Sequence, residues 1–426
     1  FHRCRSPLIV RPKPGSSAAV IASYLAALIL LGAPEPLVLW HAWRGAEAKA
    51  LEEVIKRSPL PLRAVAMPFE GYSEKLSAAL SYGAGPDLFI YPHERLGQWR
   101  QEDRLAELNV PLGSLDEHAQ SAFVDAGVTY GLPLASKGLV LFKNPALEGD
   151  ETADLWPAQP RTKPLILQDL TSYYGAFPWL AATGARPFDS TGKPALDSVG
   201  HRLGMTRLKA LVEAGVVGRG LDGAQATAAF LRGEAPFLID GPWRLEQLEE
   251  AMPEVTVHPL PKVAGKQLRP MLTIDGVFVA RGGKQVERAA RTAAFLANDR
   301  SAELRARLGG QLIPNRAVAQ RLAHEKPKLA AMARALHYGV PASTRPEMRS
   351  VWGPAKDAID AVLRRDEDPQ RAFAEAGQRL ASLLAPLPPR SDPTPWLFVA
   401  TALLFGLGWR LLGRFRHRLP GKGPRP

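Results

Sequence analysis

The feature that most constrains the fold is an alternation of short apolar segments with amphipathic ones, which begins near residue 36. Three segments have the length and apolar character of buried strands: Leu37–Trp40, Leu62–Met67 and Asp87–Ile90. Segments with helical spacing lie between them, at Ala46–Arg57 and Ser73–Ser81. Strands that alternate with helices build α/β folds, in which a mostly parallel sheet carries helices on both faces. We therefore predict an α/β fold.

A second block of the same kind follows in the later part of the chain. Extended segments are expected at Pro164–Leu167, Ala235–Ile239, Val255–Pro259 and Thr273–Ala280, and helices at Asp197–Ala214 and Ala224–Arg232. From Lys284 to Leu384 the pattern is almost entirely helical, and we interpret its arginine-rich stretch, Arg288 to Arg307, as a solvated helix face. With 426 residues, 46% of them hydrophobic, the chain is long enough for two globular lobes.

The net charge of +12 is concentrated at the two ends of the chain. Residues 1–33 contain four basic and no acidic residues, and residues 394–426 contain six basic and no acidic residues. Without these ten residues the chain has 44 basic and 42 acidic residues, a net charge of +2. Each basic end flanks an apolar run, which is the pattern of membrane topology rather than of a nucleic-acid-binding face. We therefore expect contact with membrane lipid and no nucleic-acid partner.

The first apolar run, Ala18–Ala33, predicts a signal peptide or signal anchor within a basic N-terminal segment, 1–35. Its end, Leu31-Gly32-Ala33, matches a small-x-small cleavage site poorly, so both possibilities stay open. Cys4 precedes this run, whereas the cysteine of a lipoprotein would follow it, so we do not expect Cys4 to carry a lipid. Because the chain begins with Phe1, we expect further residues upstream.

The second apolar run, Trp396–Trp409, predicts a transmembrane helix over 395–413. It is short for a membrane span, but Arg410 can extend its charged end to the interface. A proline-rich linker, 387–394, precedes the helix, and a basic cytoplasmic tail, 414–426, follows it. The alternative for this run is an amphipathic or buried C-terminal helix.

The motifs of common enzyme classes are missing from the sequence. It has no Gly-x-Ser-x-Gly elbow, no His-Glu-x-x-His pair, no P-loop and no cluster of metal-ligating residues. Its single cysteine excludes an intrachain disulfide and a cysteine-based metal site. A pair of glycosidase carboxylates cannot be recognised or excluded from sequence alone. We predict a protein that is not an enzyme and that needs no metal or cofactor.

The segment from Gly85 to Gly97 has the chemistry of a ligand-binding loop. A Gly-Pro turn leads into a short strand, and the strand is followed by an aromatic ring, a carboxylate and a guanidinium: Tyr91, Glu94 and Arg95. In open α/β sheets, ligands bind outside the carboxyl ends of the strands. An aromatic face beside two charged groups suits a neutral, hydroxyl-rich ligand, because the ring covers C–H surface and the charged groups bond the hydroxyls.

Three further elements carry aromatic residues at positions suited to ligand contact. In Phe230–Trp243, a Gly-Pro turn after an apolar strand presents Trp243. In Pro346–Lys356, Trp352 and Lys356 share one helix face if the helix continues through Pro354. In the third element, Ser172–Trp179, aromatic residues lie beside a glycine. Tyr173 and Tyr174 are the candidate ligand contacts, whereas a core role is equally plausible for Phe177 and Trp179.

These elements together resemble the maltose-binding-protein family of ABC-transporter solute receptors, over roughly residues 37–385. The resemblance is strongest at Gly85–Gly97 and Gly233–Trp243. It implies a two-lobed periplasmic-binding-protein-like fold (type II), with a sugar bound between the lobes. It also implies an N lobe of about 36–136 plus 276–312 and a C lobe of about 137–275 plus 313–386, joined by crossing segments near Ala135–Gly138 and Val255–Ala280.

Residue by residue, the resemblance implies a set of sugar contacts. Tyr91 takes the place of a stacking tryptophan, and Glu94 and Arg95 take the place of an Asp-Arg pair that binds hydroxyls. Trp243 and Trp352 match two further stacking tryptophans.

The remaining matches include departures from the family pattern. Tyr174 matches a ligand-contacting tyrosine, and Lys356 stands where an arginine is usual. Lys137 occupies the position of a ligand-binding glutamate, which reverses the charge, and Trp43-Arg44 aligns with an acidic-basic pair. These departures suggest a sugar other than maltose: a modified, acidic or non-glucan one.

The resemblance implies an extracytoplasmic receptor that delivers a sugar or oligosaccharide of the maltodextrin kind to an ABC permease and, through it, to the ATPase. The receptor domain would lie on the periplasmic or extracellular side of the cell membrane, with both termini cytoplasmic. Because a free receptor needs only a signal peptide, one hypothesis for the second apolar run is that it is the start or a remnant of a fused permease subunit. The alternatives are a membrane-anchored carbohydrate-active enzyme and a sugar-sensing ectodomain.

Overall fold

A computed structural model describes residues 35–110, 115–386 and 401–410. Residues 1–383 belong to one compact unit and residues 384–426 to another. In the second unit, residues 401–410 are helical.

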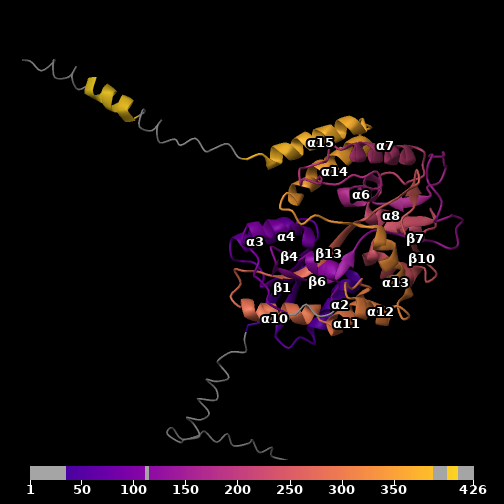
Figure 1. Cartoon of the computed structure of the whole chain (residues 1–426), viewed down its shortest axis with the longest axis horizontal. Coiled ribbons are helices and arrows are strands. Elements are labelled where there is room, and N and C mark those ends of the chain that lie inside the picture. The colour runs from indigo at the N-terminus through magenta and orange to yellow at the C-terminus, as the bar shows by residue number, and fades with distance from the viewer. Residues whose placement is uncertain (1–34, 111–114, 387–400, 411–426) are drawn as a thin grey trace, which may run out of the picture. The chain divides into compact units, whose positions relative to one another are not determined.

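The first sheet contains the N-terminal strands and one long strand from much later in the chain (Figure 1). Its order is β14 (Val340–Pro341), β13 (Met271–Val279), β3 (Leu88–Pro92), β1 (Leu37–His41) and β2 (Leu62–Ala66), with β6 (Gly131–Lys137) also paired to β13. The strands β1, β2 and β3 are mutually parallel. The long strand β13 runs antiparallel to both β3 and β6. We expected a mostly parallel sheet, and this expectation is wrong for β13. The strand enters the first sheet from the other lobe and therefore runs in the opposite direction to β3 and β6.

The second sheet is smaller and is also mixed. Its order is β10 (Thr256–His258), β7 (Val140–Lys143), β9 (Phe237–Asp240) and β8 (Ile166–Gln168). The pair β8–β9 is parallel, whereas β7 is antiparallel to both of its neighbours. Only Gly138 and Leu139 separate the end of β6 in the first sheet from the start of β7 in the second. The two sheets are the centres of the two lobes of this α/β fold.

Helices from distant parts of the chain cover the first sheet (Figure 1). They are α2 (Gly45–Ile55), α3 (Tyr72–Ser81), α4 (Leu96–Gln101), α10 (Val286–Ala297) and α11 (Asp299–Gly309). The late helix α11 packs on the early helix α2, and α10 packs on β6 and β13. The N lobe is thus completed by the chain only after it has built most of the C lobe.

Eight further helices lie outside the layer on the first sheet. They are α6 (Tyr173–Ala181), α7 (Val199–Glu213), α8 (Gly223–Leu231), α9 (Leu245–Ala251), α12 (Arg316–Leu322), α13 (Pro327–Ala335), α14 (Met348–Arg364) and α15 (Pro369–Leu384). The helices α8 and α13 pack on the second sheet, and α14 packs on α6 and α7. The region after Lys284 is mostly helical, as predicted, with β14 as an interruption.

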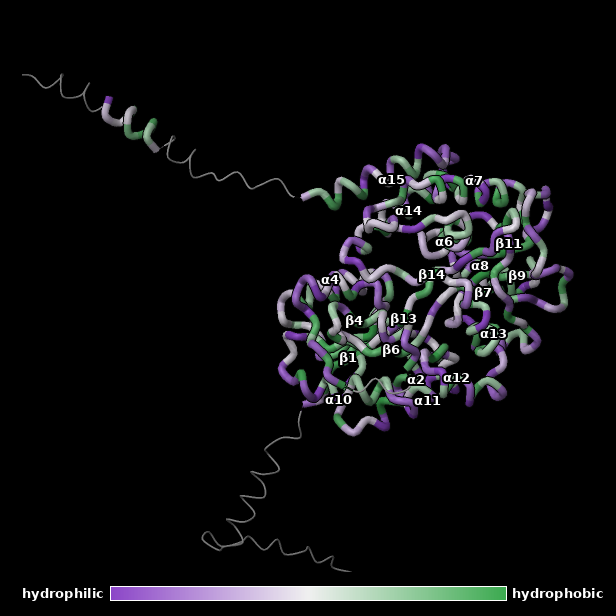
Figure 2. Tube along the Cα trace, viewed as in Figure 1, coloured by the Kyte–Doolittle hydropathy of each residue, from purple (hydrophilic) through white to green (hydrophobic). Residues whose placement is uncertain are grey.

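Each lobe has its own hydrophobic core. Figure 2 shows the most hydrophobic residues along the sheets and the hydrophilic ones mainly in loops and on outer helix faces. One core lies between the first sheet and the helices α2 and α10, and another lies around Phe142, Phe230 and Leu238. A third, aromatic cluster surrounds Phe89 and Trp99. Two separate cores allow the lobes to move as bodies about the segments that join them.

Arg305 is buried, at 1% exposure, so the expected solvated face from Arg288 to Arg307 is wrong at this position. Its guanidinium donates to the backbone oxygen of Leu134 (Nη2, 3.1 Å) and to Oε1 of Gln311 (Nε, 3.0 Å). These bonds replace the water that the charged group loses, and they fix α11 to β6.

The structure tests the two predicted membrane segments only in part. No helix among the described residues is long and apolar enough to cross a membrane. The run Ala18–Ala33 lies outside the described residues. Of the segment 395–413, only residues 401–410 are described, and the linker 387–394 and the tail 414–426 also lie outside.

Candidate ligand-binding site

Several candidate residues of the N lobe lie at one edge of the first sheet. Trp43 follows β1, Glu94 follows β3, and Lys137 is the last residue of β6. Because β3 and β6 are both antiparallel to β13, they run in the same direction as each other and as β1. Their carboxyl ends therefore meet at one edge, where open α/β sheets bind ligands.

The second sheet presents its candidates in the same way, after the parallel strands β8 and β9. Tyr173 and Tyr174 begin α6, whose first turn is capped by the Ser172 hydroxyl as it accepts from the amide of Gly175 (3.1 Å). Trp243 lies in the short 3₁₀ helix Pro242–Arg244 that follows β9.

The position of the Trp243 ring depends on Gly241. A Cβ atom at Gly241 would lie 2.2 Å from the nearest indole carbon of Trp243, which is too close for any side chain. Because glycine has no Cβ, the ring can lie flat against the turn. The Gly-Pro-Trp sequence therefore fixes the indole at the end of β9, as the sequence predicted, with 38% of Trp243 exposed.

Lys137 forms a buried charged cluster with two carboxylates. Its Nζ lies 2.8 and 2.9 Å from the two carboxylate oxygens of Glu47 and 3.2 Å from Oδ2 of Asp275. The Trp43 indole donates to the same Oδ2 of Asp275 at 2.7 Å. Burial alone would lower the pKa of Lys137, but Asp275 and Glu47 raise it above its usual value, so the amine stays charged. The reversed charge at this position is therefore compensated within the protein.

The same lysine lies between indole rings of the two lobes. Its Nζ is 5.9 Å from the centroid of Trp43, in the N lobe, and 5.8 Å from the centroid of Trp243, in the C lobe. Both distances are within the range of cation–π attraction. Lys137 thus connects the candidate residues of one lobe with those of the other.

Glu94 and Arg95 have buried polar atoms without a hydrogen-bond partner among the described residues: Oε2 of Glu94 and Nε of Arg95. Burial raises the pKa of Glu94 to about 7, and the nearby Arg95 guanidinium opposes this rise. Arg95 uses Nη1 to bond Oε1 of Gln98 at 3.0 Å. Neighbouring residues thus leave two buried polar atoms without a partner among the described residues, and such atoms are stabilised by a polar ligand.

Tyr174 lies where both lobes contribute charge. Its hydroxyl is buried, which raises its pKa, and the carboxylates of Asp275, Asp240 and Glu94 add to that rise. Its ring lies 6.4 Å from that of Trp243, at an interplanar angle of 45°. The structure therefore brings together Trp43, Glu94, Lys137, Tyr174 and Trp243.

Three other candidates pack against aromatic residues of their own lobes. Tyr91 is 8% exposed and lies in the aromatic cluster, 5.1 Å from the ring of Trp99. Tyr173 is 1% exposed, and its hydroxyl is 2.9 Å from Nε2 of His201. Trp352 is half-buried, with its ring edge-on to Tyr173 at 6.1 Å. Of these three residues, Trp352 has the most surface available to a ligand.

Two charged candidates lie at the surface with partners of their own. Arg44 pairs with Glu70 at 3.0 Å, and both side chains are exposed. Lys356 pairs with Asp360 one turn later on α14. This helix does continue through Pro354, as the shared face of Trp352 and Lys356 requires.

Sequence reasoning did not find Glu47 and Asp275, the partners of Lys137. A signal for Asp275 was available, because it is a lone carboxylate within the apolar strand Met271–Val279 and such a residue needs a partner when buried. Glu47 gave no such signal. It lies on the buried face of α2 with Ala46 and Ala50, but an acidic residue in the first turn of a helix is common and does not by itself indicate a buried partner.

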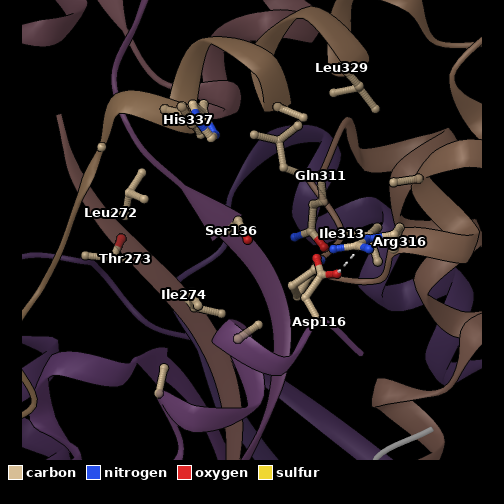
Figure 3. A pocket seen from close by; sticks show the side chains of 18 of the residues that line it. Asp116, Ser136, Leu272, Thr273, Ile274, Gln311, Ile313, Arg316, Leu329 and His337 are labelled. Atoms are coloured by element: carbon tan, nitrogen blue, oxygen red, sulfur yellow. Dashed lines mark ion pairs between the residues drawn. The ribbon is translucent and has the colours of Figure 1, made fainter. Parts of the chain in front are cut away.

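A cavity of about 1080 Å³ has a different lining, which includes residues of β6 and β13 and of the segment from Ala306 to Thr344. Figure 3 shows Leu272, Thr273 and Ile274 of β13 on one side, Gln311, Ile313 and Arg316 on the other, Ser136 of β6 between them, and His337 above Leu272. Ser136 lines this cavity, whereas its neighbour Lys137 does not. No residue predicted from the sequence as a ligand contact lines the cavity.

A comparison with known families decides the class of protein. The model of a family described as bacterial extracellular solute-binding protein matches residues 61–303, which is more than half of the chain. The chain belongs to this family of binding proteins.

Relatives of this solute-binding protein include a galactooligosaccharide-binding protein of Bacillus subtilis (strain 168). The two are 26% identical over 349 residues, which cover 76% of this chain and 83% of the relative. A maltooligosaccharide ABC transporter solute-binding lipoprotein of Streptococcus pneumoniae serotype 4 is 23% identical over 330 residues, which cover 72% and 78% of the two chains.

Solved structures share the two-lobed fold. The maltotriose-binding protein of Thermus thermophilus, bound with maltotriose, superposes with a TM-score of 0.71 at 22% identity, over 82% of this chain and all of that chain (100%). MalX from Streptococcus pneumoniae, in complex with maltopentaose, superposes with a TM-score of 0.72 at 20% identity, over 82% of this chain and 100% of that chain. This solute-binding protein therefore has the α/β two-lobed fold that the sequence predicted.

Proposed function

We propose that this solute-binding protein is the extracytoplasmic receptor of an ABC importer and that it binds a neutral sugar or oligosaccharide where its two lobes meet. The observation that carries the proposal is an exposed indole, Trp243, on one lobe and the unpaired buried atoms of Glu94 and Arg95 on the other. A sugar has C–H faces for the ring and hydroxyls for the polar atoms. A ligand that contacts both lobes favours their closed arrangement over an open one.

The relatives support this ligand class, since their names state galactooligosaccharide and maltooligosaccharide binding. The charges at the site argue for a neutral ligand. Lys137 already has two carboxylate partners, Glu47 and Asp275, so the reversed charge does not create a site for an acidic sugar. Oligosaccharides that contain uronic acids should bind more weakly than neutral ones of the same length.

Delivery and anchoring belong to the same proposal. The closed receptor would dock on permease subunits, whose ATPase then drives uptake, and a span at 395–413 would hold it at the outer face of the membrane, with 414–426 in the cytoplasm. Its lobes would comprise 36–136 with 276–312 and 137–275 with 313–386. The pairing of β7, β8, β9 and β10 in one sheet agrees with this division. The strands β6, β13 and β14 cross its boundaries, because all three belong to the first sheet, and the sheet therefore assigns Lys137 and Asp275 to the N lobe. A gene that ends at Pro426 beside a separate, intact permease gene would contradict a fusion with the permease.

The test is calorimetric titration of the full chain, purified in a detergent without a sugar headgroup, with malto- and galacto-oligosaccharides. Saturable heat with the oligosaccharide recovered unchanged supports a receptor. Turnover of the oligosaccharide would support the enzyme alternative instead. No binding to either series, in protein shown to be folded by circular dichroism, would contradict the proposed ligand class.

A further inference from the structure

Trp43 is shielded at the meeting of the two lobes, although it aligns with a ligand-contacting position. It is 5% exposed, whereas Trp243, on the other side of Lys137, is 38% exposed. The side chains that cover Trp43 are themselves nearly buried: Lys137 is 12% exposed, Glu47 9% and Asp275 7%. The ammonium group of Lys137 lies over both indoles, 5.9 Å from the centroid of Trp43 and 5.8 Å from that of Trp243.

The cluster is held in place from behind by further buried side chains. Gln311 donates from Nε2 to Oε1 of Glu47 at 3.3 Å, and Arg305 donates from Nε to Oε1 of Gln311 at 3.0 Å. Arg305 is in turn bonded to the backbone of β6 through the oxygen of Leu134, at 3.1 Å. Two cations and two carboxylates thus balance one another in a single network that starts and ends on β6. Such a satisfied network fixes the lysine in one position.

We propose that Lys137, held by Glu47 and Asp275, is a specificity-determining residue that keeps ligand away from Trp43 and so limits the length of oligosaccharide bound. This inference rests on the proposed sugar-binding function. When Lys137 is shortened, the indole face of Trp43 and the two carboxylates become available to one further sugar ring. Carboxylates accept hydrogen bonds from sugar hydroxyls, and an indole stacks on a sugar face, so the freed groups are chemically suited to a sugar.

The experiment compares wild type with Lys137→Ala by calorimetric titration of the full chain against a ladder from maltose to maltoheptaose and a galacto-oligosaccharide ladder. In the wild type, affinity should stop rising at a certain length. In Lys137→Ala it should go on rising for one more sugar unit, which binds about three- to tenfold more tightly. Lys143→Ala is the matched control, because Lys143 on β7 pairs with Glu151 at 2.6 Å and contacts no candidate residue. The control should keep the wild-type length limit.

A second variant covers the case in which Lys137→Ala fails to fold because two carboxylates lose their partner. In Lys137→Ala/Glu47→Gln one of those charges is removed, and the same shift in length limit is expected. An unchanged limit in a folded variant overturns the inference. So does an equal loss of affinity at every length, since that would mean that Lys137 binds the ligand directly. If the wild type binds no member of either ladder, the proposed function fails and the inference fails with it.

Discussion

The two lobes present different chemistry where they meet. The N-lobe side is a polar wall made of Glu47, Glu94, Lys137 and Asp275, and all four side chains are nearly buried. The C-lobe side is an aromatic wall made of Tyr174, Trp243 and Trp352, of which Trp243 is the most exposed. The side chains of the polar wall form most of their hydrogen bonds and ion pairs with other protein groups, whereas the aromatic wall has exposed ring surface that a ligand can contact. Changes to the first should therefore have their largest effect on stability, and changes to the second should have their largest effect on affinity.

The largest effect is expected from breaking the polar wall at its centre. Lys137→Ala leaves Glu47 and Asp275 without their cation, and loss of one partner from a buried ion pair costs about 4 kcal/mol of unfolding free energy. Urea unfolding followed by circular dichroism measures this loss. A change below about 1 kcal/mol would contradict the view that the polar wall is structural.

Glu94 should make the stability of the polar wall depend on pH. Burial, opposed by Arg95, raises its pKa from 4.5 to about 7, so the native state holds the proton more tightly than the unfolded state does. The resulting stabilisation is fully present below pH 4.5 and is lost as the pH rises through about 7. Relative to Glu94→Gln, the wild type should lose up to about 3 kcal/mol over this range.

Urea unfolding of both proteins across that pH range checks the prediction. The exposed Glu107→Gln is the control, and its stability should follow that of the wild type. If the difference between wild type and Glu94→Gln stays constant with pH, Glu94 does not titrate as its burial requires.

On the aromatic wall, Trp243→Ala should weaken binding without loss of fold. Removal of a stacking indole from the centre of a site costs about 2 kcal/mol, or roughly thirtyfold in Kd. Because Trp243 is 38% exposed, the unfolding free energy should fall by less than about 1 kcal/mol. Calorimetric titration and urea unfolding measure the two effects separately.

Trp156→Ala is the matched control for that substitution. Trp156 is also partly exposed, at 36%, but its ring contacts Arg207 rather than any candidate ligand residue. The affinity of the Trp156→Ala variant for the oligosaccharide should equal that of the wild type. Equal affinity in Trp243→Ala would remove Trp243 from the site.

The smallest effect on affinity and stability is expected from substitution of Lys356, which lies outside both walls. Its ion pair with Asp360 is on the surface of α14, and solvent-exposed pairs within a helix contribute about 0.5 kcal/mol or less. Lys356→Ala should change both affinity and stability by no more than that, in the same two assays. A tenfold loss of affinity would show instead that Lys356 leaves Asp360 to bind the ligand.

Much of the scaffold could be predicted because it follows from local pattern. The strands β1, β3 and β9 are apolar runs that end in turn residues, and the sequence located each to within two residues of its carboxyl end. The direction of β13 could not be predicted, because it depends on the chain returning to the first sheet from the second. The fold class can be predicted from the local sequence pattern alone, whereas prediction of the strand order requires the path of the whole chain.

The chemistry of Lys137 shows where the prediction of the site stopped. The sequence identified the residue and its unusual charge, but it could not show that Glu47, 90 positions away, neutralises that charge. An ion pair between distant segments has no local signature, and only a lone carboxylate such as Asp275 in an apolar strand hints that one exists. Without that partner, an acidic ligand was a reasonable hypothesis; with it, a neutral one is better supported.

The position of Lys137 between Trp43 and Trp243 also has an optical consequence. Indole emission responds to nearby charge, and here one ammonium group lies 5.9 and 5.8 Å from rings that belong to different lobes. Lys137 ends β6, and only two residues separate it from β7 in the other sheet, so a rotation between the lobes changes at least one of these distances. Intrinsic tryptophan fluorescence should therefore report opening and closing of this protein without any added label.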